Sequence, residues 1–247
     1  MSELRTAVVI PARYGSSRFP GKVLAQLAGK PMIQHVFERA KASKADMCLI
    51  AADDQRVIDA CASFGAQAIM TDPALPSGSD RIAAALAGIE ADIVINVQGD
   101  EPLLPTEAID ALIDRMKQAD RPDMATIGVK GSREELDNPN KVKLVMSNSG
   151  KALYFSRSMI PFLRSGGVDM DVYLHWGIYA YKREVLERFV SLDAGKLENC
   201  EKLEQLRALE NDISIQVLIS NLESVGVDTP EDLVRAEAKL AEKLKNI

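Results

Sequence analysis

The stretch that decides the fold is Thr6-Ala-Val-Val-Ile-Pro-Ala-Arg-Tyr-Gly-Ser-Ser-Arg-Phe-Pro-Gly-Lys22. Its first five residues form an apolar run that is typical of a strand buried on both faces. The loop over residues 11–21 then brings together glycines, hydroxyl groups and the positive charge of Arg13, with Lys22 directly after it. Such a loop suits a triphosphate, because glycine permits close backbone approach and cations neutralise phosphate charge. The alternative is a solvated loop with incidental charges.

The rest of the first half alternates between predicted helices and predicted strands. Amphipathic spacing predicts helices over 33–41, 56–64 and 82–89, and apolar runs predict strands over 47–51, 67–70 and 93–97. This alternation predicts an α/β fold whose parallel sheet is covered by helices on both faces. Ligands bind outside the carboxyl ends of the strands in such sheets, so the informative residues should follow Ile10 and Val97.

The second half has a different pattern. We expect a hairpin from strands 142–146 and 152–155, a strand over 173–181, helices over 183–190 and 201–210, and a strand over 213–219. Thr229-Pro230 is a typical helix start. Residues 156–171, which contain Pro161 and two glycines, form a candidate excursion that we expect to help make a dimer contact. Without repeats or a clear linker, residues 1–247 are predicted to form one domain.

Composition excludes several classes of protein. The 247 residues are 47% hydrophobic and carry 30 Lys+Arg against 36 Asp+Glu, a net charge of −6. These values exclude disorder and argue against a general nucleic-acid or anionic-membrane surface, while allowing a local basic pocket. Apolar runs are too short to span a bilayer, and residues 1–5 lack the pattern of a signal peptide. Three widely spaced cysteines, Cys48, Cys61 and Cys200, predict buried thiols in a reducing cytoplasm.

A second polar motif follows the predicted strand 93–97. It reads Asn96-Val-Gln-Gly-Asp-Glu-Pro102, so Asp100 stands beside a glycine at a strand end. A carboxylate in this position is a good ligand for Mg²⁺. A turn or helix-capping role for Asp100 is the alternative.

Together these motifs resemble the 3-deoxy-manno-octulosonate (Kdo) cytidylyltransferase, or CMP-Kdo synthetase, family. The resemblance depends on an ordered set of segments that covers nearly the whole chain, namely residues 9–22, 29–33, 77–81, 96–102, 152–157, 175–179, 203–207 and 226–232. It implies a nucleotide-diphospho-sugar-transferase-like fold, which is a Rossmann-like, mostly parallel sheet with a smaller mixed β excursion. It also implies CMP transfer from CTP to the anomeric hydroxyl of Kdo, Mg²⁺ as cofactor, a cytoplasmic homodimer and a role in lipopolysaccharide biosynthesis.

The resemblance also assigns roles to residues. Those expected to bind the nucleotide are Ala12, Arg13, Gly15, Ser16, Lys22, Ser77, Gly78 and Arg81. Those expected to bind the sugar acid are Gln98, Arg157, His175, Glu204 and Gln205, with Arg157 gripping the carboxylate. Asp100 and Asp228 are expected to hold Mg²⁺, and together with Arg13 and Lys22 to support catalysis.

Other interpretations stay open at this point. His175 has the pattern of a core histidine, and Glu204 and Gln205 could lie on the solvated face of a helix. Trp176 and the pair Ser79-Asp80 depart from the residues expected in the family, which leaves the sugar less certain than the reaction. An 8-amino octulosonate or a nine-carbon sugar acid is the alternative acceptor. A non-catalytic nucleotide-binding module is the alternative from another class.

Overall fold

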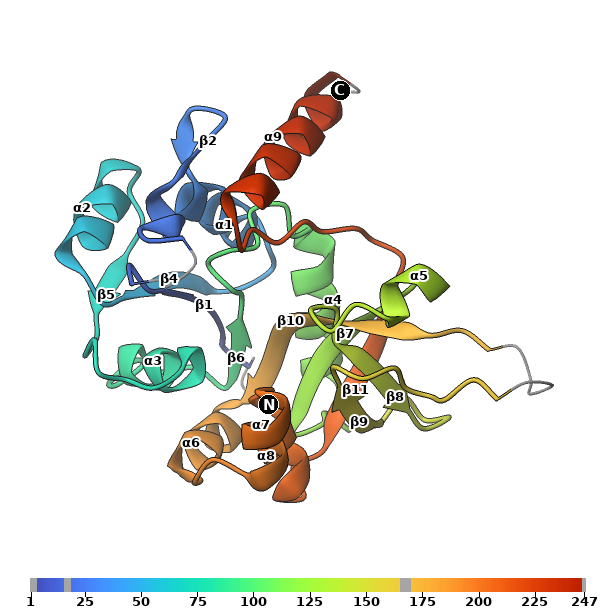
Figure 1. Cartoon of the computed structure of the whole chain (residues 1–247). Helices are drawn as coiled ribbons and strands as arrows, with labels where there is room; N and C mark the ends of the chain where they lie inside the picture. Colours follow the sequence, from blue (N-terminus) through green and yellow to red (C-terminus); the bar gives the residue numbers. More distant parts are fainter. Residues whose placement is uncertain (1–3, 16–18, 165–169, 246–247) are drawn as a thin grey trace.

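A computed structural model describes residues 4–15, 19–164 and 170–245 of the chain (Figure 1). The central sheet has the strand order β11-β7-β10-β6-β1-β4-β5. Its strands are β1 (Thr6–Ala12), β4 (Met47–Ala52), β5 (Ala68–Met70), β6 (Ile93–Asn96), β7 (Met124–Lys130), β10 (Tyr173–Lys182) and β11 (Ile215–Ser220). All neighbours pair in parallel except β10, which runs antiparallel to both β6 and β7. The predicted α/β fold with a mostly parallel sheet is confirmed.

Strand β1 explains why the sheet is covered on both sides. Successive side chains of a strand point to opposite faces, and every residue of β1 is buried. Val8, Ile10 and Ala12 pack into one hydrophobic cluster, while Ala7 and Val9 pack into another. Because both faces of β1 pack against apolar side chains, the sequence of this strand has to be an apolar run.

The two clusters place the helices in two layers. Helices α1 (Met32–Lys41), α2 (Gln55–Ser63) and α4 (Thr106–Met116) contribute side chains to the first cluster. The second cluster includes residues of α3 (Gly78–Ala85), α6 (Arg183–Ser191) and α8 (Gln205–Glu210). The layers leave the carboxyl ends of β1, β4 and β6 at one edge of the sheet.

Smaller elements surround this frame. The predicted hairpin is present as β8 (Lys143–Met146) and β9 (Ala152–Ser156), attached through β8 to the end of β10. The loop after β1 leads into the short helix η1 (Lys22–Leu24). The ribbon of β2 (Gln26–Leu27) and β3 (Lys30–Pro31) follows η1. Helix α9 (Pro230–Lys245) packs near this ribbon through a third apolar cluster that includes Leu27 and Ala236 (Figure 1). The remaining helices are α5 (Arg133–Leu136) and α7 (Lys196–Glu201).

Two helix predictions need correction. Helix α3 spans 78–85 rather than 82–89, because Ser77 caps it by accepting a hydrogen bond from the amide of Asp80 at 3.2 Å. The helix predicted over 201–210 is two helices, α7 and α8. Lys202 separates them with a left-handed backbone at φ 53°, which no continuous helix can accommodate. Strand β7 and helix α4 are additional elements that the sequence analysis did not predict.

The expected excursion begins where β9 ends, at Ser156. Residues 157–164 contain no helix or strand, and residues 165–169 lie outside the described part of the chain. Phe162 exposes 79% of its surface and Met170 exposes 52%. The segment therefore presents apolar side chains to its surroundings.

The cysteines are only partly as expected. All three thiols are free, with Cys61 buried and Cys48 half-buried, but Cys200 is exposed because α7 presents it to the outside. Burial raises the pKa of the Cys48 and Cys61 thiols to about 12, so both stay protonated. Within the described residues no helix is both long enough and apolar enough to cross a membrane.

Candidate active site

Lys22 joins three segments at the carboxyl edge of the sheet. Its buried Nζ donates to Asp100 Oδ2 at 2.7 Å and to Asp228 Oδ1 at 3.2 Å. Gly21 makes this approach possible, since it turns the loop into η1 with a left-handed φ of 69°. Burial alone would lower the pKa of Lys22, but the two carboxylates outweigh burial and raise the pKa above its usual value.

Asp228 precedes the start of helix α9, where a carboxylate can cap the helix or face the site. Asp232 rather than Asp228 accepts the amides of Asp228 and Thr229, both at 2.9 Å, and the amide of Asp232 donates to Thr229 Oγ1 at 3.3 Å. These contacts cap helix α9. The Asp228 side chain reaches Lys22 instead, so helix capping does not explain it.

Asp100 and Asp228 fit a hard divalent cation that also binds substrate oxygens. Asp100 lies 78 residues and Asp228 lies 206 residues from Lys22 in the sequence, and both carboxylates converge on its ammonium group. No cluster of three or more His, Cys, Asp or Glu side chains suited to a metal occurs among the residues described. Mg²⁺ is commonly held by one or two carboxylates together with phosphates and water, so two carboxylates suffice.

The expected nucleotide residues of the first loop are linked to those of α3 by Asp53. Asp53 Oδ1 accepts the amide of Tyr14 at 2.8 Å, and Oδ2 lies 3.9 Å from Arg13 Nε and 3.6 Å from Arg81 Nη2. Arg13 is half exposed, whereas the side chain of Arg81 has no exposed surface and donates to Thr71 Oγ1 at 2.6 Å. The structure therefore places Arg81 behind the loop beside Asp53, and its Nε and Nη2 are buried without a hydrogen-bond partner among the described residues.

The remaining nucleotide candidates lie beside this cluster. Ala12 is buried in β1 and Gly15 is exposed in the loop, while Ser16 lies outside the described residues. Ser77 and Gly78 form the start of α3, and a Cβ on Gly78 would stand 3.4 Å from the Pro11 ring. The two loops that resemble a nucleotide site are thus in contact.

Gly99 brings the second motif against the first. A Cβ at this position would stand 2.8 Å from the backbone oxygen of Pro11, closer than real Cβ contacts allow. Only glycine lets the segment after β6 pass this close to the end of β1. This contact places Asp100 beside Lys22.

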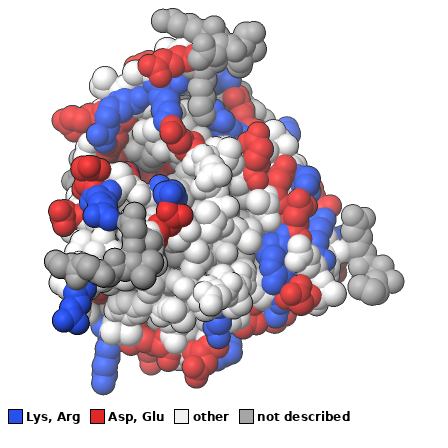
Figure 2. All heavy atoms as spheres, turned by 90° about the vertical axis from the view of Figure 1, so that its right-hand side faces the viewer, with Lys and Arg blue, Asp and Glu red and all other residues white. Residues whose placement is uncertain are grey.

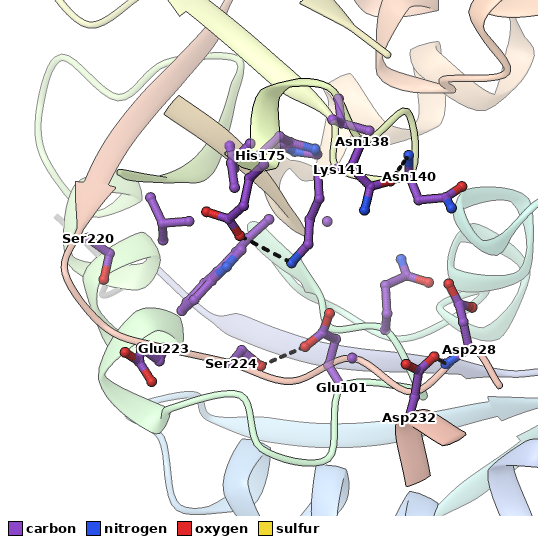
Figure 3. A pocket seen from close by; sticks show the side chains of 18 of the residues that line it. Glu101, Asn138, Asn140, Lys141, His175, Ser220, Glu223, Ser224, Asp228 and Asp232 are labelled. Atoms are coloured by element: carbon purple, nitrogen blue, oxygen red, sulfur yellow. Dashed lines mark hydrogen bonds and ion pairs between the residues drawn. The ribbon is translucent and has the colours of Figure 1, made fainter. Parts of the chain in front are cut away.

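Most of the expected sugar residues line one cavity of about 1140 Å³ (Figure 3). Gln98, Arg157, His175 and Gln205 contribute to its wall, together with Asp228. Gln98 Nε2 donates to Asn96 Oδ1 at 2.9 Å, and Gln205 Nε2 is buried with no hydrogen-bond partner in the described structure. A polar cavity that contains an unpartnered amide suits a ligand rich in hydroxyl groups.

Glu204 is the exception among these candidates. It does not belong to the cavity wall, and its Oε2 accepts Ser79 Oγ at 3.0 Å on the side of α3. Burial raises the pKa of the Glu204 carboxyl above its usual value. Adjacent residues of a helical backbone point about 100° apart, so Glu204 faces α3 while Gln205 faces the cavity.

Arg157 has partners other than the expected carboxylate. Its guanidinium donates to three backbone carbonyls, those of Glu201 at 2.8 Å, Pro139 at 3.0 Å and Lys202 at 3.3 Å. The fully buried Lys143 also donates to a carbonyl, that of Asn138, at 3.1 Å. These cations tie three separate stretches of chain into one wall of the cavity.

His175 lines the cavity and is half-buried against the core. Its Nε2 lies 3.0 Å from Thr126 Oγ1, whose hydroxyl also donates to the carbonyl of Ile178 at 2.7 Å. With that hydroxyl proton in use, Nε2 carries the imidazole proton and donates it to Thr126. The ring packs edge-on against Phe155 with centroids 5.0 Å apart. His35, in contrast, is a structural histidine that bonds to the carbonyl of Leu27 at 2.7 Å.

Two site carboxylates were missed in the sequence analysis. Asp53 directly follows β4, so the rule that identified Asp100 applies to it as well. Glu101 follows Asp100, lines the cavity and accepts Ser224 Oγ at 2.6 Å. Burial raises the pKa of the Glu101 carboxyl to about 7, which no feature of the sequence signals.

Comparisons with known proteins agree with this arrangement. A family model described as "Cytidylyltransferase" matches residues 7–215. The chain is 50% identical over 247 residues to a 3-deoxy-manno-octulosonate cytidylyltransferase of Thermodesulfovibrio yellowstonii, covering 94% of this chain and 96% of the relative. It is 49% identical over 244 residues to an 8-amino-3,8-dideoxy-manno-octulosonate cytidylyltransferase of Shewanella frigidimarina, covering 96% and 99%.

Solved structures give the same result. A structure of CMP:2-keto-3-deoxy-manno-octonic acid synthetase complexed with CTP superposes with a TM-score of 0.93 at 41% identity, covering 97% of this chain and 99% of that one. A cytidylyltransferase of Leptospira borgpetersenii has a TM-score of 0.64 at 16% identity, over 97% and 87%. The second likeness concerns the fold alone.

The buried imidazole of His175 predicts a pH dependence of stability. Burial lowers its pKa to about 3, whereas the unfolded chain binds a proton near pH 6.5. Between these values the unfolded state holds more protons, so acidification below pH 6.5 should destabilise the fold, by at most about 1.4 kcal/mol per pH unit. We expect His175→Asn to flatten urea-unfolding free energies between pH 6.5 and 4 relative to wild type. Parallel curves would contradict the buried, neutral imidazole.

Proposed function

The chain belongs to the cytidylyltransferase family, and from this premise we propose that it transfers CMP from CTP to 3-deoxy-D-manno-octulosonate (Kdo). The products are CMP-Kdo and diphosphate. The proposal rests on the bridge from Lys22 to Asp100 and Asp228, directly beside the polar cavity of about 1140 Å³. The chain is accordingly an enzyme of the nucleotidyltransferase class.

The chemistry requires charge neutralisation and alignment. The anomeric hydroxyl oxygen of the acceptor attacks the α-phosphorus, a new P–O bond forms, and the bond to the β-phosphate oxygen breaks to release diphosphate. The hydroxyl proton leaves the acceptor in the same step. No covalent enzyme intermediate is needed, so the protein acts by holding two anionic substrates in line and balancing their charge.

We assign the nucleotide to the edge formed by β1, η1 and the start of α3. Arg13 and Lys22 supply cations for the triphosphate, while Ala12, Gly15, Ser77 and Gly78 provide backbone and hydroxyl groups around it. Arg81 acts from behind through Asp53. The acceptor occupies the adjoining cavity, against Gln98, His175 and Gln205, with Arg157 shaping its wall and Glu204 packed behind it.

Mg²⁺ is the cofactor that this donor set suits. Asp100 and Asp228 would hold the ion, which when bound would draw charge from the triphosphate and orient it. Lys22 balances the charge of both carboxylates and stays within hydrogen-bond distance of each.

Kdo is favoured over its 8-amino analogue as acceptor. Relatives with either substrate in their names are almost equally similar to this chain, but the 0.93 superposition is to the enzyme for the unmodified sugar acid. Activated Kdo from a cytoplasmic enzyme would supply lipopolysaccharide biosynthesis, which is the pathway we propose.

Diphosphate release tests the function directly. We expect the purified enzyme with CTP and Mg²⁺ to release diphosphate on addition of Kdo, and more slowly with the 8-amino sugar acid. Lys22→Ala should reduce kcat/KM for CTP about ten- to a hundredfold, because a charge-assisted contact contributes roughly 1.5–3 kcal/mol. Acceptor-independent release, or none, would contradict the proposed reaction. Faster turnover of the 8-amino acid would transfer the assignment to that substrate.

Asp228 gives a second prediction with a matched control one helical turn away. Asp228→Asn should fold normally, require more Mg²⁺ and turn over far more slowly, since an amide lacks the charge that favours Mg²⁺. Asp232→Asn should lower Tm, because the start of α9 loses a negative charge and the ion pair with Arg235, while the wild-type Mg²⁺ dependence is kept. A Mg²⁺ titration of both variants makes the comparison. An unchanged dependence in Asp228→Asn would remove that residue from the metal site.

A homodimer is the assembly we propose, with residues 156–171 contributing to the contact. Figure 2 shows a broad uncharged area on the face toward β8, β9 and β11, with charged groups around it. Leu153 of β9 and Ile219 of β11 expose 59% and 45% of their surfaces. Exposed apolar side chains on an uncharged face are typical of an interaction surface. We expect a dimer in sedimentation velocity at micromolar concentration and a shift toward monomer in Leu153→Lys; a wild-type monomer would contradict the proposal.

A further inference from the structure

Tyr14 lies between the two cations that we assign to the triphosphate. It directly follows Arg13, and its carbonyl accepts the amide of Gly21, the residue before Lys22, at 3.0 Å. This hydrogen bond joins the two ends of the loop that connects β1 to η1. A displacement of Tyr14 would therefore change the spacing between Arg13 and Lys22.

The loop itself and the neighbouring strand hold Tyr14 in place. A Cβ at Gly21 would stand 3.3 Å from Cζ of the Tyr14 ring, closer than most Cβ contacts in proteins. The ring thus packs directly on the backbone where η1 begins. The Tyr14 amide donates to Asp53 Oδ1 at 2.8 Å, directly after β4. The position of Tyr14 is thereby tied to both β4 and η1.

Arg56 covers the Tyr14 ring from helix α2. Its guanidinium carbon lies 3.5 Å from the ring centroid, which is a cation–π contact. Asp54 orients the guanidinium, because its two carboxylate oxygens accept Nε at 2.7 Å and Nη2 at 2.5 Å. The same carboxylate caps α2 by accepting the amide of Arg56 at 2.9 Å. The start of α2 therefore presents a flat, oriented cation to the loop.

The pair of Arg56 and Asp54 contributes little to the stability of the fold by itself. The Arg56 side chain is 60% exposed, and exposed ion pairs are weak because water screens both charges. What the pair does determine is the position of the guanidinium over Tyr14, and so the position of the loop ends.

We propose that Arg56 and Tyr14 are positioning residues for the triphosphate, holding the loop ends so that Arg13 and Lys22 keep the spacing that the nucleotide needs. The proposal rests on the proposed function and extends it to helix α2, which has no other role in the site. Cations that are already in place lose less conformational freedom when an anion binds. The affinity for CTP should therefore depend on the stack, while the affinity for the acceptor should not.

Calorimetric titration with CTP and Mg²⁺ in the absence of acceptor measures nucleotide affinity without turnover. We expect Tyr14→Ala to raise the Kd for CTP about tenfold and Arg56→Ala to raise it about three- to fivefold. Tyr14→Phe keeps the ring and should restore the wild-type Kd. In diphosphate-release assays the KM for the acceptor should be the same in all these variants as in wild type.

A double variant shows whether Arg56 acts through the ring. The Kd of Tyr14→Ala/Arg56→Ala should equal that of Tyr14→Ala, because the cation has no ring left to hold. The matched control is Arg5→Ala. Arg5 is another exposed arginine in an ion pair, with Glu90 at 2.9 Å, but it precedes β1 at the end of the strand away from the loop. This variant should bind CTP as wild type does.

A wild-type Kd in Arg56→Ala would overturn the proposal, and this exposed substitution decides the matter if Tyr14→Ala does not fold. Equal losses of CTP and acceptor affinity would also overturn it, since they indicate a general loosening of the fold. Additive losses in the double variant would do the same, because Arg56 would then act independently of Tyr14. If the wild-type enzyme binds CTP but releases no diphosphate with any sugar acid, the proposed function fails, while the Kd values still decide the positioning role.

Discussion

The site depends on one buried ammonium group that satisfies two carboxylates. Lys22 stands at the end of the first loop, Asp100 after β6 and Asp228 before α9, and their ion bridge holds these three segments together. Two carboxylates this close would repel each other without a cation between them. The bridge therefore balances the charge of the site and fixes the C-terminal helix to the edge of the sheet. Gly99 is part of the same constraint, since only its lack of a side chain lets the two loops meet.

Much of the fold could be predicted because its strands are buried on both faces. The runs at β1, β4 and β6 are apolar without interruption, so their pattern needs no knowledge of their neighbours. Strand β7 was missed because Thr126 and Gly128 interrupt its apolar run. Residue 128 is a glycine because a Cβ there would stand 3.0 Å from the Val217 side chain. Val217 is distant in sequence, so the local pattern does not signal this contact. Helix α4 has clear helical spacing of apolar residues, so it could have been predicted from the sequence.

The residues of the site also differ in how well the sequence predicts their positions. Residues that lie at strand ends, such as Arg13 and Asp100, follow from the rule that ligands bind at the carboxyl edge of a parallel sheet. The partners of Arg157 could not be predicted from the sequence, because they are backbone carbonyls and every residue type carries one. Arg81 has the residue type of a phosphate ligand, and in this structure its buried guanidinium faces Asp53 and Thr71. Both cations hold backbone or loop here, and their ligand roles stay predictions.

The two halves of the site are stabilised by different interactions, which bears on how acceptor choice can vary. The proposed nucleotide edge is held by ion pairs of two buried cations, Lys22 with Asp100 and Arg81 with Asp53, and losing a carboxylate leaves a buried cation without its partner. The acceptor wall is held by Arg157 and Lys143 on backbone carbonyls, and these bonds do not depend on which side chains the wall presents. Side chains that face the cavity, Lys141 among them, can therefore change with little effect on the wall itself. Relatives named for two different sugar acids are almost equally similar to this chain, which is what a fixed nucleotide edge beside a substitutable acceptor wall would produce.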